Sequence, residues 1–324
     1  MGKNRICEML GIDYPIIEGG LAYVGNGALA AAVSNGGGLG VVGSAGRSVD
    51  DFREQIRIAE EKTSKPFGVN LPISEHSDNS AYVQAILDHK HLIKAVSISA
   101  GNPRPLIPIF KEAGMKVMVL TSTVTHSLKA EQAGADIIIC EGFEAGGHNG
   151  PAEMTLFSLI PQVSRAVKVP VVAAGGIADG RGIAAAMILG ADGVQLGTRF
   201  VATIECQAHE AYKRMLIESQ DDATVVMERS IGRVTRVLKG PFVDKILEVE
   251  KTNPSIEDML PYIRGINNKV AAIEGSVQDG WLNCGQSVGL IDSIQSATDV
   301  VRSLAAEVEA IMTHSPSFFE SFRS

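Results

Sequence analysis

The sequence predicts an α/β protein that folds as a (β/α)8 barrel, or TIM barrel, with a smaller helical domain inserted after the eighth strand. Three observations favour this fold. Short apolar runs alternate with helical segments between Pro15 and Leu196, and eight such runs can be counted. Runs such as residues 137–139, three isoleucines without polar alternation, are typical of strands buried on both faces. Glycine and alanine are abundant and aromatic residues make up only 5% of the chain, which suits helices packed closely on strands.

The predicted strands and helices follow one another in regular order. Strands are predicted at 15–20, 39–42, 66–71, 95–99, 116–120, 137–139, 171–174 and 193–196. Helices are predicted at 28–35, 50–65, 106–113, 125–133 and 155–167, and a further helix begins at Gly180. Eight strands alternating with helices are what a single barrel of this kind requires. A doubly wound open sheet is the alternative, but no GxGxxG motif follows the first strand.

The alternation of strands and helices stops after Phe200. Residues 201–270 carry two or three helix-like segments and charged patches, without further strand alternation. We therefore expect residues 1–200 and 271–324 to form the barrel, and residues 201–270 to form an inserted helical substrate or lid domain over its mouth. We expect residues 297–312 to form a final amphipathic helix. We expect residues 313–324 to form a loose tail.

Composition and charge exclude several classes of protein. The net charge of −8 comes from interspersed acidic and basic residues, so no nucleic-acid partner is expected. The four cysteines show no CxxC or Cys/His ligand spacing, which predicts free thiols in a reducing cytoplasm and no metal site. No apolar run approaches the ~20 residues of a membrane span, and no signal core begins the chain. We expect a cytoplasmic protein; its oligomeric state stays open, with a homodimer as one candidate.

A glycine-rich loop with a single histidine follows the sixth predicted strand. Residues 134–150 read GADIIICEGFEAGGHNG. Gly142, Gly146 and Gly147 remove side chains that would keep a flat ligand away from the backbone. His148 is the only titratable nitrogen in the loop, and imidazole titrates near neutral pH. Because this loop lies at the carboxyl end of its strand, the pattern predicts a reactive site.

The seventh and eighth predicted strands also end in glycine. Gly175 and Gly176 follow the seventh strand, and Gly197 and Thr198 follow the eighth. In such barrels these two loops commonly hold a phosphate through backbone N–H groups. Flavin mononucleotide (FMN) fits the pattern, with its phosphate on these four residues and its ring system reaching across the barrel mouth toward His148. Tight strand-to-helix turns are the alternative explanation for the glycines.

Asn70 stands at the end of the third predicted strand. Its amide can both donate a hydrogen bond to, and accept one from, the edge of a flavin ring. An Asx-type turn at a strand end is the alternative explanation.

Several longer strings of the sequence point to a known family. They are EGFEAGGHNG, PVVAAGGIADGRGIAAAMILGADGVQLGTRF and IDYPIIEGGLA, together with GVN at 68–70, AGNP at 100–103 and GQSVGLI at 285–291. These strings resemble the nitronate monooxygenases, formerly 2-nitropropane dioxygenases, and their close relatives the flavin-dependent type II enoyl-[acyl-carrier-protein] reductases. The resemblance runs through most of the chain. It implies an FMN-bound barrel with a smaller helical substrate domain inserted after the eighth strand.

The resemblance also implies roles for individual residues. One group falls where the family contacts the flavin or borders its ring: Gly19, Gly20, Asn70, Glu141, Gly146, Gly147 and Gln195. A second group falls where the family binds the phosphate: Gly175, Gly176, Gly197 and Thr198. His148 falls on the histidine that is catalytic in the family.

The activity that the resemblance implies is oxidation of alkyl nitronates by FMN and O2. His148 would act as a base toward the neutral nitroalkane or hold the anion. The LIPQV segment at 159–163 and the Asn-Gly after His148 favour this branch of the family.

Two alternatives remain open. The first is an enoyl-[acyl-carrier-protein] reductase, which would use NAD(P)H as co-substrate and acyl carrier protein as partner. The second is a barrel without catalytic activity that binds a phosphorylated metabolite, with His148 as an ordinary loop residue.

Overall fold

The computed structural model describes residues 4–73 and 78–322 of the chain. Its main sheet contains eight parallel strands: β1 (Ile16–Glu18), β2 (Gly40–Gly43), β3 (Phe67–Pro72), β4 (Ile93–Ser99), β5 (Lys116–Thr121), β6 (Ile137–Glu141), β8 (Val171–Ala174) and β9 (Gly193–Leu196). The strand order is β1-β9-β8-β6-β5-β4-β3-β2, and Leu39 beside β2 also pairs in parallel with Ile17 of β1. The two ends of the sheet therefore meet. The predicted (β/α)8 barrel is confirmed, and the open-sheet alternative is wrong.

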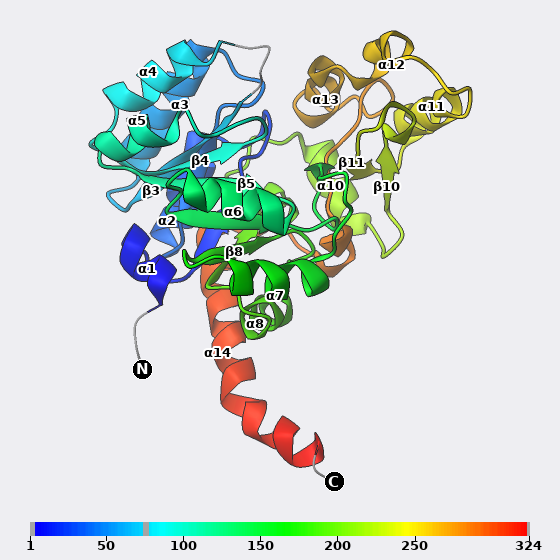
Figure 1. Ribbon diagram of the computed structural model, residues 1–324. Coiled ribbons are helices and arrows are strands. Elements are labelled where there is room, and N and C mark those ends of the chain that lie inside the picture. The colour runs from blue at the N-terminus through cyan, green and yellow to red at the C-terminus, as the bar shows by residue number, and fades with distance from the viewer. Residues whose placement is uncertain (1–3, 74–77, 323–324) are drawn as a thin grey trace.

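Helices cover the outside of the barrel (Figure 1). They are α2 (Gly27–Asn35), α3 (Val49–Lys62), α4 (Ser80–Asp88), α5 (Ile107–Glu112), α6 (Val124–Gln132), α7 (Leu156–Ala166), α8 (Gly180–Ile188) and α14 (Ala297–Phe322). The Asp179 side chain caps α8 by accepting a hydrogen bond from the Gly182 N–H at 2.8 Å. Among the described residues, no helix is both long and apolar enough to cross a membrane.

The last helix, α14, joins two distant parts of the barrel. It packs against α2 and α8, with Val300, Val301 and Leu304 buried. The Thr298 hydroxyl donates to the Ala32 carbonyl oxygen at 2.8 Å, and the Glu307 carboxylate accepts from the Gly180 N–H at 2.7 Å. The predicted loose tail is wrong for residues 313–322, because α14 continues to Phe322 and projects away from the body (Figure 1). Residues 323–324 lie outside the described residues.

The apolar strand residues divide between two layers of the core. Ile137 and Ile139 lie in the cluster inside the barrel, whereas Ile138 lies in the larger cluster between strands and helices. This division explains the run of three isoleucines, since successive side chains of a strand point to opposite faces and both faces are buried. The inner cluster is closed below by α1 (Arg5–Leu10), whose Asn4 cap also donates to the Asp192 carbonyl oxygen at 2.7 Å.

The segment after β9 contains both helices and strands. Its helices are α9 (Thr198–Val201), α10 (Glu210–Glu218), α11 (Pro241–Glu250), α12 (Ile256–Ile263) and α13 (Gly265–Ala272), with short 3-10 turns η1 (Arg229–Ile231) and η2 (Gln286–Leu290). The expectation that residues 201–270 hold no strand is wrong. β10 (Thr224–Met227) pairs antiparallel with β11 (Thr235–Leu238), which in turn pairs with β7 (Gly147–His148) in the histidine loop. Each of these strands has at most four residues, which is too short for alternation to be recognised in the sequence.

A third apolar cluster supports this segment. It contains Met227, Val237, Val243, Ile246, Met259 and Trp281. Trp281 lies beyond residue 270 in sequence, yet it packs with these side chains rather than with the barrel core. In Figure 1, α11, α12 and α13 gather beside the barrel, across from α3, α4 and α5.

Candidate active site

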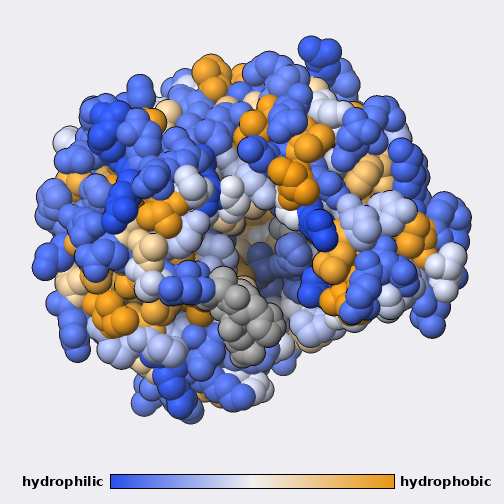
Figure 2. All heavy atoms as spheres, turned by 90° about the horizontal axis from the view of Figure 1, so that it is seen from above, coloured by the Kyte–Doolittle hydropathy of each residue, from blue (hydrophilic) through white to orange (hydrophobic). Residues whose placement is uncertain are grey.

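The carboxyl ends of the barrel strands surround a cavity of about 1040 Å³. This volume lies at the upper end of the range for ligand-binding pockets. All twelve residues predicted for the site line it: Gly19, Gly20, Asn70, Glu141, Gly146, Gly147, His148, Gly175, Gly176, Gln195, Gly197 and Thr198. Seen from above, the cavity opens as a hollow in the surface (Figure 2). The structure therefore brings together turns that are widely separated in the sequence.

One end of the cavity has the chemistry of a phosphate site. Gly175 and Gly176 have φ values of +101° and +66°, and a Cβ on Gly175 would lie 2.9 Å from the Ala145 nitrogen. Side chains are thus excluded, and a ligand can approach the backbone. The Thr198 hydroxyl also lines this end, where it accepts a hydrogen bond from the Gly285 N–H at 3.0 Å; a hydroxyl can both accept and donate. These residues fit the phosphate group of FMN.

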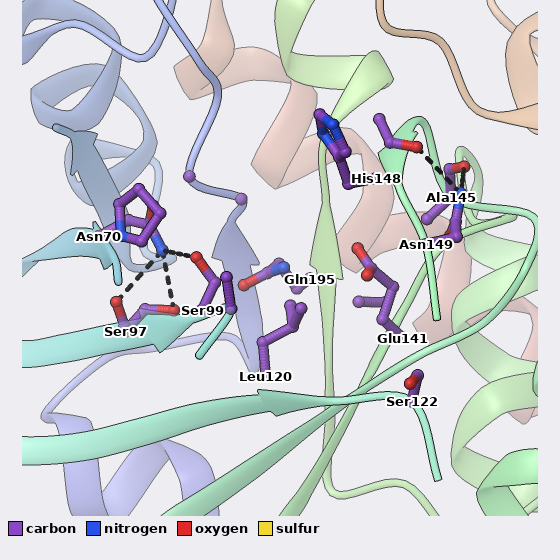
Figure 3. Close-up of a pocket in the computed structure, with 18 of the residues that line it drawn as sticks. Asn70, Ser97, Ser99, Leu120, Ser122, Glu141, Ala145, His148, Asn149 and Gln195 are labelled. Atoms are coloured by element: carbon purple, nitrogen blue, oxygen red, sulfur yellow. Dashed lines mark hydrogen bonds between the residues drawn. The ribbon is translucent and has the colours of Figure 1, made fainter. Parts of the chain in front are cut away.

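Asn70 is held at another wall of the cavity by β4. Its Nδ2 donates to the Ser97 carbonyl oxygen at 3.1 Å and to the Ser99 hydroxyl at 3.3 Å (Figure 3). A Cβ on Gly20 would lie only 2.2 Å from the Asn70 Cγ, so that the amide packs directly on the Gly20 backbone. These bonds cross to the neighbouring strand, which argues against the Asx-turn alternative. Ser97 and Ser99 were not among the predicted site residues, although their spacing of two places both on one side of the predicted strand.

His148 enters the cavity from β7. Its backbone pairs with Thr235 of β11, and its side chain points into the cavity (Figure 3). Burial by the surrounding protein, together with the positive charge of Arg233, lowers the pKa of His148 below its ordinary value. The imidazole is therefore neutral at physiological pH and can accept a proton.

Glu141 ends β6, and its carboxyl also points into the cavity (Figure 3). Protein surrounds it, and this burial raises its pKa to about 8. Most of the carboxyl is thus protonated near neutral pH and can donate a hydrogen bond. The cavity presents one neutral base, His148, and one neutral acid, Glu141.

Arg236 of β11 anchors the loop that carries His148. Its guanidinium lies 4.5 Å from the centre of the Phe143 ring, and its Nε donates to the Phe143 carbonyl oxygen at 3.1 Å. The same guanidinium donates through Nη1 to the Thr224 hydroxyl at 3.2 Å. This contact could not be predicted from the sequence, because no local pattern connects Phe143 with an arginine so far along the chain.

Asn149 stabilises the same loop from within. Its Nδ2 donates to the carbonyl oxygens of Ala145 at 2.9 Å and Gly147 at 3.1 Å (Figure 3). The sequence offered a signal here, since Asn149 belongs to the GGHNG string, but assigned it no structural role.

Comparison with known proteins identifies the family of this chain. The sequence model of the family described as nitronate monooxygenase matches residues 3–307. A probable nitronate monooxygenase of Staphylococcus saprophyticus is 31% identical, and the match covers 96% of this chain and 99% of that protein. The (3aS,4S,5R,7aS)-5-hydroxy-7a-methyl-1-oxo-octahydro-1H-indene-4-carboxyl-CoA dehydrogenase of Mycobacterium tuberculosis is 30% identical over 94% of this chain and 96% of that protein.

Two solved structures share the whole fold. FabK from Thermotoga maritima superposes with a TM-score of 0.90 at 40% identity, and the match covers 98% of this chain and 100% of that one. Nitroalkane oxidase from Streptomyces ansochromogenes superposes with a TM-score of 0.83 at 29% identity, covering 95% and 99%. These relatives are enzymes, which argues against a barrel that only binds a metabolite. The chain belongs to the nitronate monooxygenase family and is a flavin-dependent oxidoreductase.

Proposed function

We propose that this protein oxidises alkyl nitronates with O2 and that its flavin is FMN. One observation carries the proposal: residues suited to a phosphate and a neutral imidazole line the same cavity. Membership of the nitronate monooxygenase family and the likeness to nitroalkane oxidase support it. When bound, FMN supplies the electron transfer, while the protein binds and orients the reactants.

Two ionisable groups of the cavity, His148 and Glu141, suit this reaction. The neutral imidazole of His148 can take the proton from the carbon of a nitroalkane, or hold the nitronate by hydrogen bonding. The protonated carboxyl of Glu141 can donate a hydrogen bond to a nitro oxygen. Because neither group carries a negative charge near neutral pH, an anionic nitronate meets no repulsion from them.

We further propose that two parts of the chain have different roles. Residues 1–200 and 271–324 would bind FMN, and residues 201–270 would act as the substrate domain over the barrel. The pairing of β11 with β7 supports this role, as do Tyr212 and Asn268, which line the cavity from α10 and α13. The cytoplasm is the proposed location, since the four cysteines are free and three of them are buried.

A second candidate is reduction of an enoyl thioester with NAD(P)H. The 40% identity to FabK exceeds the 31% identity to the staphylococcal nitronate monooxygenase, and the Mycobacterium tuberculosis relative is named for a carboxyl-CoA. In this case acyl carrier protein would be a partner, and His148 would orient the thioester or the nicotinamide.

Anaerobic mixing of the purified, flavin-loaded protein distinguishes the two candidates. Bleaching of the flavin absorbance by propyl-2-nitronate, followed by its return on admitting O2, is the result expected for nitronate oxidation. Rapid bleaching by NADH or NADPH, followed by its return on adding a crotonyl thioester without O2, would instead establish the reductase. If nitronate leaves the flavin oxidised, the leading proposal is wrong.

A further inference from the structure

Two buried polar side chains without hydrogen-bond partners lie beside the strand that carries His148. They are Thr235, whose hydroxyl oxygen is unpaired, and Glu228, whose two carboxyl oxygens are both unpaired among the described residues. Thr235 is fully buried, and Glu228 is 1% exposed. Unpaired buried polar groups make a folded protein less stable, and they are rare. Their presence next to the site indicates that they serve its chemistry rather than the fold.

The register of the small sheet places the Thr235 side chain next to that of His148. Met227 of β10, Thr235 of β11 and His148 of β7 form one row across the three strands. Residues directly opposite each other in such a pair have neighbouring side chains on the same face. The next residue, Asn149, donates its N–H to the Val234 carbonyl oxygen, so the His148–Thr235 pair is of the non-hydrogen-bonded kind. In pairs of this kind the side chains approach most closely. The ring nitrogen nearer to the backbone, Nδ1, is the one that the Thr235 hydroxyl can reach.

Glu228 comes directly after β10 and lies near the same hydroxyl. Its φ is +75°, a left-handed conformation that residues other than glycine seldom adopt. Burial raises the pKa of Glu228, and the charge of Glu250 on α11 adds to the rise; the Thr235 hydroxyl and the charge of Arg233 act against it. The charge of Arg233 also lowers the pKa of His148. The carboxyl and the imidazole therefore share one charged neighbour, and Thr235 lies next to both.

We propose that Thr235 and Glu228 are positioning residues for His148. Nε2 of His148 takes the proton from the substrate carbon, and the electron pair of the broken C–H bond stays on the nitronate. The imidazole then donates from both nitrogens. Nδ1–H donates to the Thr235 hydroxyl, and this hydroxyl donates its own proton to a carboxyl oxygen of Glu228. Such bonds often tighten only as charge develops in the reaction.

This chain of hydrogen bonds stabilises the protonated imidazole and directs Nε2 toward the cavity. The inference rests on the proposed role of His148 as the base. It extends that role to Thr235 and Glu228, two residues that do not line the cavity.

The primary test measures the pKa of His148 by NMR titration of the flavin-loaded protein, labelled at histidine. Thr235→Val keeps the shape of the side chain and removes the hydroxyl, and Glu228→Leu removes the carboxyl. We expect the pKa of His148 to fall by about one unit in Thr235→Val, because the imidazolium loses an acceptor, and to fall also in Glu228→Leu. Thr235→Ser retains the hydroxyl and should keep the wild-type pKa. The matched control Ser230→Ala removes a hydroxyl of the same turn that donates to Glu250, and it should keep that pKa too. An unchanged pKa in Thr235→Val or in Glu228→Leu would overturn the proposal.

Kinetics and melting temperatures separate positioning from a structural role. In Thr235→Val and Glu228→Leu, kcat for a neutral nitroalkane should fall about tenfold, because a weaker base removes the carbon-bound proton more slowly. The kcat for preformed nitronate, which gives up no proton, should equal that of the wild type. The melting temperatures should not fall, since each variant removes unpaired buried polar atoms. Equal losses for the two substrates, together with a lower melting temperature, would show a structural role and overturn the proposal.

Failure of this inference can be distinguished from failure of the proposed function, because the NMR titration needs no turnover. A lower His148 pKa in both variants of a protein that does not oxidise nitronates would support the inference and refute the proposed function. An unchanged pKa in variants of a protein that does oxidise them would do the reverse.

Discussion

Thr235 of β11 lies directly opposite His148 of β7 in an antiparallel pair. The next residue, Asn149, donates its backbone N–H to the Val234 carbonyl oxygen at 2.7 Å. The imidazole that faces the cavity is therefore positioned jointly by the barrel and by the segment inserted after β9. A shift of β11 would move the His148 backbone with it.

Arg236 should affect kcat, because it holds the loop that carries His148. Arg236→Met removes the nearer of two cations over the Phe143 ring and leaves the partly buried Phe143 carbonyl oxygen without this hydrogen bond. We expect kcat to fall about tenfold while flavin content is unchanged, since ~1.4 kcal/mol corresponds to a factor of ten. Arg57→Met is the control, because the exposed Arg57 pairs with Glu54 on the surface of α3 and has no contact with Phe143. A kcat equal to that of the wild type would show that the loop does not need Arg236.

Removal of the imidazole should separate catalysis from cofactor binding. For His148→Ala we expect kcat to fall by about 10²- to 10⁴-fold, the usual contribution of a general base. The flavin should remain bound, because the groups suited to its phosphate lie on other loops. Steady-state rates and the ratio of flavin to protein absorbance provide the two measurements. A retained turnover number would exclude His148 as the base.

The pH profile should report the ionisation of two groups in the cavity, His148 and Glu141. The pKa of His148 is lowered, so activity should persist below pH 6.5 and decline only where the imidazole becomes protonated. The pKa of Glu141 is about 8, so above that pH a negative charge appears and repels an anionic nitronate. We therefore expect kcat/KM for a neutral nitroalkane, which needs His148 as the base, to fall at the acid end, and kcat/KM for preformed nitronate to fall at the alkaline end. Glu141→Gln should extend the plateau to higher pH, and a profile identical to that of the wild type would contradict the role of Glu141.

Replacement of Gly20 by alanine should weaken flavin binding. In Gly20→Ala the new Cβ would meet the Asn70 Cγ at 2.2 Å and displace the amide from the cavity wall. We expect flavin affinity to fall about tenfold, the effect of one good hydrogen bond. Gly240→Ala is the matched control, since nothing lies within 4 Å of its added Cβ. The fluorescence of flavin released on dilution measures this difference in affinity. Equal release from Gly20→Ala and Gly240→Ala would contradict the predicted contact between the added Cβ and Asn70.

Glu18 should make the protein less stable as pH rises. It is fully buried on β1, its Oε2 accepts from the Val41 N–H at 3.0 Å, and burial raises its pKa well above the ordinary value of 4.5. Between the unfolded and folded pKa values the native state binds more protons, so stability is greatest below the unfolded pKa and decreases toward the folded pKa. Glu18→Gln should remove this slope and stabilise the protein at pH 8 by about 1.4 kcal/mol for each unit of the rise.

Urea unfolding of both proteins at pH 5 and pH 8 tests the Glu18 prediction. The midpoint of the wild type should fall more between these values than that of Glu18→Gln. Parallel pH dependence in the two proteins would show that Glu18 is ionised in the folded state.

The barrel and the twelve residues that line its cavity could be predicted because their signals are local. Residues 137–139 indicate a strand buried on both faces. A glycine at the end of each predicted strand marks where the following loop begins. Barrel topology then brings those loops to one rim, which is why residues as distant as Gly19 and Thr198 line one cavity.

The contacts that position the site depend on partners far apart in sequence. Arg236 reaches Phe143 only because β11 pairs with β7, and strands of two and four residues leave no periodic pattern. The helical continuation beyond Met312 was missed for a different reason. A Ser-Pro-Ser stretch at 315–317 reads as a helix end, whereas α14 runs through it.

The place of α14 sets a limit on when the protein can finish folding. This helix fastens Ala32, near the start of the chain, to Gly180, which lies beyond its middle. During synthesis, the helix becomes available only after the ribosome has released nearly everything that precedes it. Until then the nascent barrel leaves apolar surface of α2 and α8 uncovered, so the outer layer of helices cannot close before Leu304 has left the ribosome.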